Sequence, residues 1–190
     1  MNAEFILSNL LLGTGLAMDA FSASVADAFA EPGMPRRKGV LIASVFAFFQ
    51  ALMPMTGRLL LYAAERSFAF VTSVIPYIAF ALLAYVGGRM IYNGVNGREA
   101  EARGVGAGAL LAQGVATSID ALSAGFAMDK YSLMLSLAAS LIIAAVTFVI
   151  CVIGALAGRR FSSRTGGKAQ TVGGIILIAI GVKILLEAFL

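Results

Sequence analysis

The 190-residue sequence contains no histidine, no tryptophan and a single cysteine, Cys151. A chain with one cysteine cannot form an intrachain disulfide, and without histidine it lacks the usual ligands of zinc and any imidazole proton relay. It also has no glycine-rich run that ends in Gly-Lys-Ser or Gly-Lys-Thr, which excludes the phosphate-binding loop of ATP-driven motors. Any metal bound by this chain is therefore expected to be held mainly by oxygen.

Charged residues are also scarce, at 13% of the chain against 60% for apolar residues. A soluble domain carries roughly 25% charged and about 45–50% apolar residues, so this composition cannot cover a protein with a water-facing surface. We therefore expect an integral membrane protein that is not an enzyme and has the lipid bilayer as its partner. We attribute the net charge of +4 to basic cytoplasmic loops, not to a nucleic-acid partner.

Six long apolar segments follow one another along the chain, separated by short polar ones. Because one span takes roughly 20 apolar residues, we predict an all-α integral membrane fold with six transmembrane helices. The predicted spans are 4–29, 39–62, 69–94, 105–128, 131–157 and 168–190. We expect the first to be a true span and not a signal peptide, since no basic residue precedes it, its apolar stretch is too long and it contains Asp19.

Lysine and arginine concentrate in the connections after the first, third and fifth predicted spans. The connections after the second and fourth spans hold only Arg66 and Lys130. By the positive-inside rule the first group is cytoplasmic, which places both termini outside the cytoplasm. The basic residues of that first group are Arg36, Arg37, Lys38, Arg98, Arg103, Arg159, Arg160, Arg164 and Lys168.

The two halves of the chain resemble each other. Segment 16–23 aligns with segment 117–124 at an offset of 101 residues, which places Asp19 over Asp120. Weaker matches place Gly57 over Gly154, Gln50 over Thr147, and segment 87–93 over segment 181–187.

A duplicated unit of three spans must enter the membrane in the opposite direction the second time. We therefore predict two inverted three-helix repeats, residues 1–97 and 98–190, within a single membrane domain. Inverted repeats are typical of secondary transporters, whose substrate site lies near the midplane where the halves meet.

Asp19 and Asp120 each lie about fourteen residues inside a predicted span. An ionised side chain at the bilayer centre costs roughly 2.5–3.5 kcal/mol on insertion scales, so both are expected to face the protein interior. Two carboxylates in a dry cavity repel each other unless a cation or a proton relieves the repulsion. The two aspartates are therefore our leading candidates for a cation site, with a structural pair of neutral carboxyls as the alternative.

Hydroxyl and amide side chains surround these aspartates at helical spacing. Ser22 follows Asp19 by three residues, while Thr117 and Ser123 flank Asp120 at the same distance, with Gln113 one turn further back. Each hydroxyl can contribute an oxygen to the site or simply bond a backbone carbonyl one turn back.

Gln50 precedes Pro54 by four residues in the second predicted span. Proline has no N–H, so Gln50 can offer both its amide oxygen and an unpaired backbone carbonyl. Hard cations such as Mn²⁺ and Mg²⁺ prefer carboxylate, carbonyl and water oxygens. The alternative is a proline kink with Gln50 paired to another helix.

Four further charged residues lie nearer the span ends, where gates would stand. We expect Arg89 to lie near Asp27 at the inner side and Lys183 to lie one turn from Glu187 at the outer side. Lys183 and Glu187 are predicted to form an i,i+4 pair or to reach the membrane interface, and each set can close one gate.

Segments 15–24, 48–57, 87–91 and 116–121, with their Met-Asp-Ala and Ile-Asp-Ala motifs, resemble the MntP-type family of bacterial manganese efflux pumps. The resemblance covers essentially the whole chain and implies a small inner-membrane exporter of Mn²⁺, related to the lysine-exporter superfamily, with no cofactor. It places Asp19 and Asp120 at the ion site. Some relatives have an acidic residue where this chain has Gln50 or Asn93, which leaves a site of lower charge here.

Two other functions remain open at this stage. One is export of an amino acid or another small solute, against which the lack of a basic residue at a span centre speaks. The other is a membrane scaffold that transports nothing and pairs its aspartates with a partner's basic helix. The sequence does not fix the oligomeric state, a homodimer being one option, or the choice among Mn²⁺, Fe²⁺, Cd²⁺ and Mg²⁺.

Overall fold

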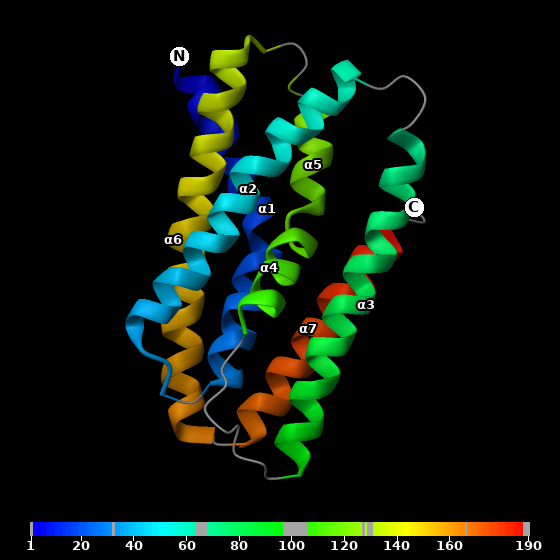
Figure 1. Ribbon diagram of the computed structural model, residues 1–190. Coiled ribbons are helices and arrows are strands. Elements are labelled where there is room, and N and C mark those ends of the chain that lie inside the picture. The colour runs from blue at the N-terminus through cyan, green and yellow to red at the C-terminus, as the bar shows by residue number, and fades with distance from the viewer. Residues whose placement is uncertain are drawn as a thin grey trace.

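The computed structural model describes residues 2–31, 33–63, 68–96, 106–126, 128, 131–165 and 167–187. Every regular element in these ranges is a helix (Figure 1). In chain order the helices are α1 (Ala3–Ala30), α2 (Arg36–Ala63), α3 (Phe68–Val95), α4 (Ala107–Ala116), α5 (Ile119–Phe126), α6 (Leu133–Thr165) and α7 (Gly167–Glu187).

Five stretches of these helices are long and apolar enough to cross a membrane. They are Ala3–Ala30, Arg36–Leu60, Pro76–Val95, Ala107–Phe126 and Leu133–Phe161, and α7 adds the shorter apolar stretch Thr171–Leu186. The prediction of an all-helical, multi-pass membrane protein is confirmed at this level. A sixth span within α7 stays a prediction.

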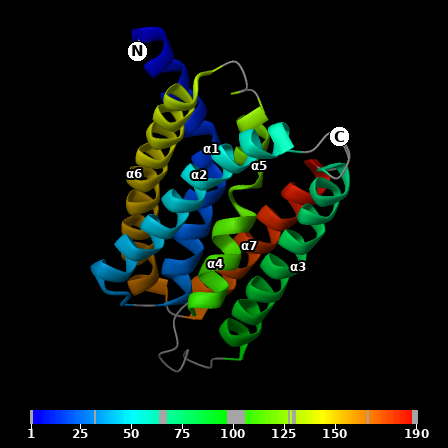
Figure 2. The same ribbon diagram turned by 45° about the horizontal axis from the view of Figure 1, so that its top comes forward.

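The helices form a bundle in which α1 and α6 lie side by side along most of their length, as do α3 and α7 (Figures 1 and 2). Helix α1 also contacts α7, while α2 contacts both α5 and α6, and α3 contacts α4. The segment α4–α5 lies between α2 and α3, so it is covered on both sides. In this arrangement Asp19 of the first predicted span and Thr117 of the fourth are buried inside the bundle.

The fourth predicted span, 105–128, is not one continuous helix. It is divided into α4 and α5 at Thr117 and Ser118. The hydroxyl of Thr117 donates to the carbonyl of Gln113 at 2.9 Å and approaches that of Gly114 at 3.5 Å, while the N–H of Ser118 bonds the carbonyl of Val115, three residues back. Side-chain hydroxyls that compete for backbone carbonyls tighten and interrupt a helix in this way.

Helices α2 and α5 approach each other at backbone distance. A methyl group added at Gly125 would lie 2.2 Å from the carbonyl oxygen of Pro54, and one at Gly57 would lie 2.1 Å from the carbonyl oxygen of Leu122. Only glycine permits such an approach, because any Cβ would overlap the partner backbone. The contact holds α5 against α2 beside Gln50.

Some sequence predictions fall outside the described residues. The boundary between the predicted repeats, at residues 97 and 98, lies there, as do Arg66, Arg98, Arg103 and Lys130. The side chains of Arg164 and Glu187 are likewise outside the described part of the chain. Of the predicted cytoplasmic residues that are described, Arg36, Arg37 and Lys38 begin α2, whereas Arg159 and Arg160 lie near the end of α6 and Lys168 at the start of α7. All three regions lie at the same end of the bundle (Figure 1).

Candidate functional site

The completely buried side chain of Gln50 joins α2 to the first and fourth predicted spans. Its Nε2 donates to the carbonyl of Leu16 on α1 at 3.1 Å and to the carbonyl of Thr117, at the break between α4 and α5, at 3.2 Å. Leu16 lies one turn before Asp19, and Thr117 lies one turn before Asp120. One amide therefore binds equivalent positions of the two aligned segments.

The amide oxygen of Gln50 is buried and accepts no hydrogen bond from the described residues. An unpaired carbonyl oxygen in a protein interior loses its bonds to water without replacement, at a cost of roughly 1–3 kcal/mol. Such an atom is a ready ligand for a hard cation. Pairing of Gln50 with another helix, one of the two alternatives considered from the sequence, is thus observed, and its amide oxygen stays unpaired. A role of this oxygen as a cation ligand stays a prediction.

Asp19 is nearly buried on α1 and forms an ion pair with Lys183 on α7. The ammonium of Lys183 lies 2.8 Å from both carboxylate oxygens, while the Lys183 side chain itself stays about half exposed. The ion pair neutralises a carboxylate that would otherwise stand uncompensated in the bundle. A cation that binds Asp19 must therefore displace this ammonium.

Asp120 lies in the first turn of α5, directly after the helix break. Its Oδ1 accepts a hydrogen bond at 2.9 Å from the backbone N–H of Ala121, and its side chain is only partly buried. A carboxylate at this place also interacts favourably with the positive end of the α5 dipole.

The two aspartates lie on opposite sides of Gln50 along the bundle axis. Helix α1 runs in the opposite direction to α4 and α5 (Figure 1), and each aspartate follows its bridged carbonyl by three residues. At 1.5 Å of rise per residue, each is displaced by about 4.5 Å from the level of Gln50, in opposite directions. No group of three acidic, histidine or cysteine side chains that could hold a metal occurs among the described residues.

The hydroxyl residues of the predicted site have different surroundings. Thr117 is buried and Ser22 is partly buried, and the hydroxyl of Ser22 donates to the carbonyl of Met18 at 3.0 Å. Ser123 is exposed on the bundle surface. The hydroxyls of Thr117 and Ser22 thus each donate to a carbonyl one turn back. The backbone carbonyl of Thr117 also accepts the hydrogen bond from Gln50.

Two of the charged residues predicted at the gates, Asp27 and Lys183, have partners that the sequence did not indicate. Asp27 is completely buried, and its Oδ1 accepts a hydrogen bond at 2.9 Å from Nε2 of Gln113, while Arg89 is exposed on α3. Lys183 contacts Asp19, and the side chain of Glu187 is not described.

Two features of the site had only weak signals in the sequence. The break at Thr117 and Ser118 was marked only by two adjacent hydroxyl residues, which often occur in continuous helices. The reach of Lys183 to Asp19 joins residues 164 positions apart, which no local spacing indicates. Because the Lys183 ammonium reaches Asp19, the lack of a basic residue at a span centre no longer argues against export of an amino acid. The ammonium is already paired with Asp19, however, and cannot bind a solute carboxylate at the same time.

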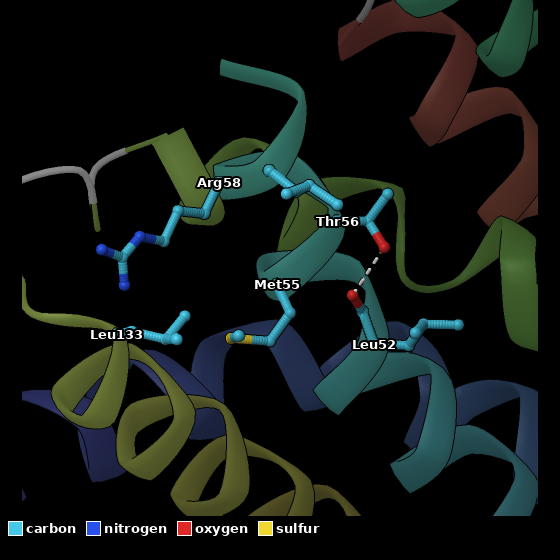
Figure 3. A pocket seen from close by; sticks show the side chains of 6 residues that line it. Leu52, Met55, Thr56, Arg58 and Leu133 are labelled. Atoms are coloured by element: carbon cyan, nitrogen blue, oxygen red, sulfur yellow. Dashed lines mark hydrogen bonds between the residues drawn. The ribbon is translucent and has the colours of Figure 1, made fainter. Parts of the chain in front are cut away.

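A pocket of about 420 Å³ opens elsewhere, between α2 and the start of α6 (Figure 3). Its lining is Leu52, Met55, Thr56, Arg58, Leu59 and Leu133. Arg58, whose Nη1 donates to the hydroxyl of Ser136, is the charged side chain among these six described residues. An apolar pocket with a fixed positive charge repels a metal cation, so the Gln50 region is the better candidate site.

Comparison with known proteins bears on the whole chain. The family model described as "Putative manganese efflux pump" matches residues 33–185. Curated relatives carry that description with MntP added: one from Gloeothece citriformis is 38% identical over 96% of this chain and 95% of its own length. One from Methanosarcina mazei is 38% identical over 95% of this chain and 96% of its own length. One from Clostridium perfringens is 35% identical over 96% of this chain and 94% of its own length. No solved structure matches the chain.

Proposed function

This chain belongs to the manganese efflux pump family, and from that premise we propose that it exports Mn²⁺ from the cytoplasm as a secondary transporter. The ion binds near the midplane, around Gln50 and between Asp19 and Asp120, and alternating access exposes the site first to the cytoplasm and then to the outside. Mn²⁺ is the cargo, and the proposal includes no resident cofactor.

The bridge made by Gln50 is the observation that carries this proposal. Its amide holds the carbonyls of Leu16 and Thr117 together at 3.1 and 3.2 Å, and its oxygen remains buried without a donor. Carboxylates stand one turn away on both sides. An unpaired carbonyl oxygen flanked by two carboxylates offers the oxygen donors that Mn²⁺ prefers, and water completes its octahedral shell.

The positions of the two aspartates suggest a direction for the ion. If both termini lie outside, Asp19 is on the cytoplasmic side of Gln50 and Asp120 on the outer side. Mn²⁺ then displaces Lys183 from Asp19, passes Gln50 and leaves by Asp120. The ion pair between Lys183 and Asp19 keeps the inner carboxylate neutral between cycles, so the empty site does not carry an unpaired buried charge.

Close contacts that involve glycine support an inverted repeat. A methyl group at Gly57 would meet the carbonyl oxygen of Leu122 at 2.1 Å, and one at Gly154 would meet the carbonyl oxygen of Phe21 at 3.0 Å. In the sequence alignment of the halves, Gly57 corresponds to Gly154 and Leu122 corresponds to Phe21. The contact of α2 with α5 is thus repeated by the contact of α6 with α1.

Helix packing follows the same symmetry. Helix α1 contacts α6 and α7, and its counterpart α4–α5 contacts α2 and α3. Two further pairs, α3 with α7 and α2 with α6, each join a helix to its own counterpart. We therefore propose six transmembrane spans in two repeats, 1–97 and 98–190, with α7 as the sixth span. Its 21 residues extend about 30 Å, the thickness of the hydrocarbon core.

The proposed location is the bacterial inner membrane, with both termini outside the cytoplasm. The three described basic regions at one end of the bundle support this orientation by the positive-inside rule. Outward movement of a divalent cation then opposes the membrane potential, which costs roughly 2.3 kcal/mol per charge and 100 mV. Export needs a second source of energy.

The test is transport by the purified chain in liposomes. We expect the wild type to move Mn²⁺, and Asp19→Asn and Asp120→Asn to reduce the initial rate by at least about tenfold. The matched control is Ser123→Ala, one turn from Asp120 and exposed on the surface, which should transport at the wild-type rate. Folding is checked by the size-exclusion profile of each variant.

Three outcomes separate the alternatives. A purified chain that moves an amino acid but no Mn²⁺ would be a solute exporter, and one that moves nothing would be a scaffold. Aspartate variants that transport at the wild-type rate would contradict the site while leaving the transport function standing.

A further inference from the structure

Asp27 is a completely buried carboxyl group that the manganese site does not use. Its Oδ1 accepts the hydrogen bond from Nε2 of Gln113 at 2.9 Å. Its Oδ2 has no hydrogen-bond partner among the described residues, and neither has Oε1 of Gln113. Asp27 and Gln113 are therefore both buried, and in each side chain one polar atom has a hydrogen-bond partner and one oxygen has none.

No positive charge is paired with Asp27 among the described residues. The charged groups that act on it are Lys38, at the start of α2, and Glu31, just after α1, and these two form an ion pair with each other. The titratable group that α6 presents is the thiol of Cys151, which is hydrogen-bonded with Ser24. Helix α7 packs Gly173 against the backbone of Ala26, and α4 contributes the uncharged Gln113.

An ionised carboxylate in these surroundings would be a buried charge without compensation, which is strongly unfavourable. Binding a proton removes the charge. The partner suits both states, because an amide can donate from nitrogen to a carboxylate or accept at oxygen from a carboxylic acid after a half turn of its plane. The carboxyl group of Asp27 therefore keeps a hydrogen-bond partner both when it holds a proton and after it has released it.

We propose that Asp27, with Gln113 as its positioning residue, is a proton-binding site that couples Mn²⁺ export to inward proton movement. This inference rests on the proposed transport of Mn²⁺. One proton binds a carboxylate oxygen of Asp27 when the manganese site is empty. When Mn²⁺ enters, the O–H bond breaks, the carboxylate keeps the electron pair and the proton passes to water at the cytoplasmic end.

The structure links this site to the manganese site in two ways. Asp27 follows Asp19 by two turns of α1, about 12 Å, a distance over which a divalent ion in a low-dielectric interior favours proton release. Gln113 is also linked to Gln50 through Thr117, whose hydroxyl bonds the Gln113 carbonyl at 2.9 Å and whose carbonyl accepts the Gln50 amide at 3.2 Å. A shift of the broken span on ion binding thus moves the partner of Asp27.

The chain has few other candidates for such a role. It contains no histidine, so near neutral pH a proton site in the bundle needs a carboxyl group with a raised proton affinity. Asp19 is paired with a lysine, and Asp120 is only partly buried. Asp27 is the completely buried acidic side chain among the described residues.

The experiment compares two transport modes of the full chain in liposomes that contain the pH dye pyranine. In the first, equal Mn²⁺ on both sides exchanges an isotope, which needs no net proton movement. In the second, an acidic lumen drives Mn²⁺ accumulation as protons leave. We expect the wild type to perform both, and Asp27→Asn to keep the exchange rate within about twofold while losing at least tenfold in proton-driven accumulation and in the pyranine signal.

Two further variants make the test specific. Glu31→Gln changes a carboxyl group of the same region that is paired with Lys38, and should keep proton-driven accumulation. Gln113→Leu removes the donor that favours the charged carboxylate, and should shift the pH dependence of accumulation to higher pH. If Asp27→Asn fails to fold, the pH shift expected for Gln113→Leu still tests the proton site.

The outcomes distinguish this inference from the transport function itself. Asp27→Asn that still accumulates Mn²⁺ against its gradient, or that loses exchange together with accumulation, would overturn the proton site. A wild type that exchanges Mn²⁺ in the first mode but shows neither proton-driven accumulation nor a pyranine response in the second would overturn it as well, while leaving Mn²⁺ transport intact. A wild type that moves no Mn²⁺ in either mode would overturn the proposed function.

Discussion

The ammonium group of Lys183 on α7 lies 2.8 Å from both carboxylate oxygens of Asp19 on α1. The contact joins the last helix to the first and occupies the carboxylate with a cation that belongs to the chain. At the proposed manganese site, Lys183 and the metal ion would therefore compete for the same two oxygens. This competition would lower the affinity for Mn²⁺ on entry and give the ion a replacement as it leaves.

Replacement of Lys183 by methionine is expected to tighten Mn²⁺ binding. Without the ammonium, the charge of Asp19 is no longer compensated, and the ion need not displace a salt bridge. We expect the Kd for Mn²⁺ to fall about tenfold, equivalent to about 1.4 kcal/mol, and export to slow because release becomes harder. Titration calorimetry on the purified protein measures the affinity.

The control for this substitution is Lys168→Met, which removes an exposed lysine of the same helix and should leave the Kd unchanged. An unchanged Kd in Lys183→Met would mean that the ion does not bind the oxygens of Asp19. A weaker affinity would show that Lys183 supports the site instead of competing for it.

Gln50 is expected to be more important for transport than its uncharged side chain suggests. Gln50→Leu removes the donor to Leu16 and Thr117 together with the unpaired oxygen, so we expect at least a tenfold loss in the rate of Mn²⁺ transport. Gln50→Glu keeps an oxygen and adds a charge, and should bind Mn²⁺ more tightly but release it more slowly. Isotope uptake into liposomes separates these effects.

Thr147 offers the control, because the proposed repeat places it at the position equivalent to Gln50 and its buried hydroxyl has no partner among the described residues. Thr147→Val keeps the shape and removes the orphan hydroxyl, so stability should stay equal or rise by about 1 kcal/mol. Transport by Gln50→Leu at the rate of Thr147→Val would refute a role for the bridge.

Sequence periodicity and hydropathy predicted the apolar helices because those signals depend on local composition. The equivalence of Asp19 and Asp120 stays a prediction, which depends on the constant spacing of the two aligned segments. The break at Thr117 and the bond from Lys183 to Asp19 were not predictable in the same way. The break depends on which carbonyl the Thr117 hydroxyl bonds. The ion pair depends on how α7 crosses α1.

The environment of Asp27 shows the same limit. Its place near a span end led to the prediction of a gate residue with Arg89 nearby. Complete burial and the bond to Gln113, 86 positions away, follow from the packing of α4 onto α1, which no spacing within either helix encodes.

The glycine contact between α2 and α5 should be sensitive to a single methyl group. Gly57→Ala and Gly125→Ala place a Cβ 2.1 and 2.2 Å from backbone carbonyl oxygens, which cannot move without separating the helices. We expect each to destabilise the fold by about 1–3 kcal/mol and to lower the Tm. Because the only cysteine, Cys151, is buried, a thiol-reactive dye reports unfolding directly.

Gly88→Ala is the matched control, since no atom lies within 4 Å of a Cβ built at this helical position. Alanine is favoured over glycine inside a helix by about 1 kcal/mol, so the Tm should stay equal or rise. A fall in Tm as large as that of Gly125→Ala would show that α3 is packed more closely than the structure indicates.

Membrane orientation can be tested with single cysteines, because the native thiol of Cys151 is buried and does not react with aqueous reagents. Asn2→Cys precedes α1, whereas Arg37→Cys lies in the exposed first turn of α2, at the opposite end of the bundle. The positive-inside rule predicts that a membrane-impermeant maleimide labels Asn2→Cys in intact cells and Arg37→Cys only after permeabilisation. The reverse pattern would place Asp19 on the outer side of Gln50, so Mn²⁺ would meet Asp120 first and the ion pair of Lys183 with Asp19 would guard the exit instead of the entrance.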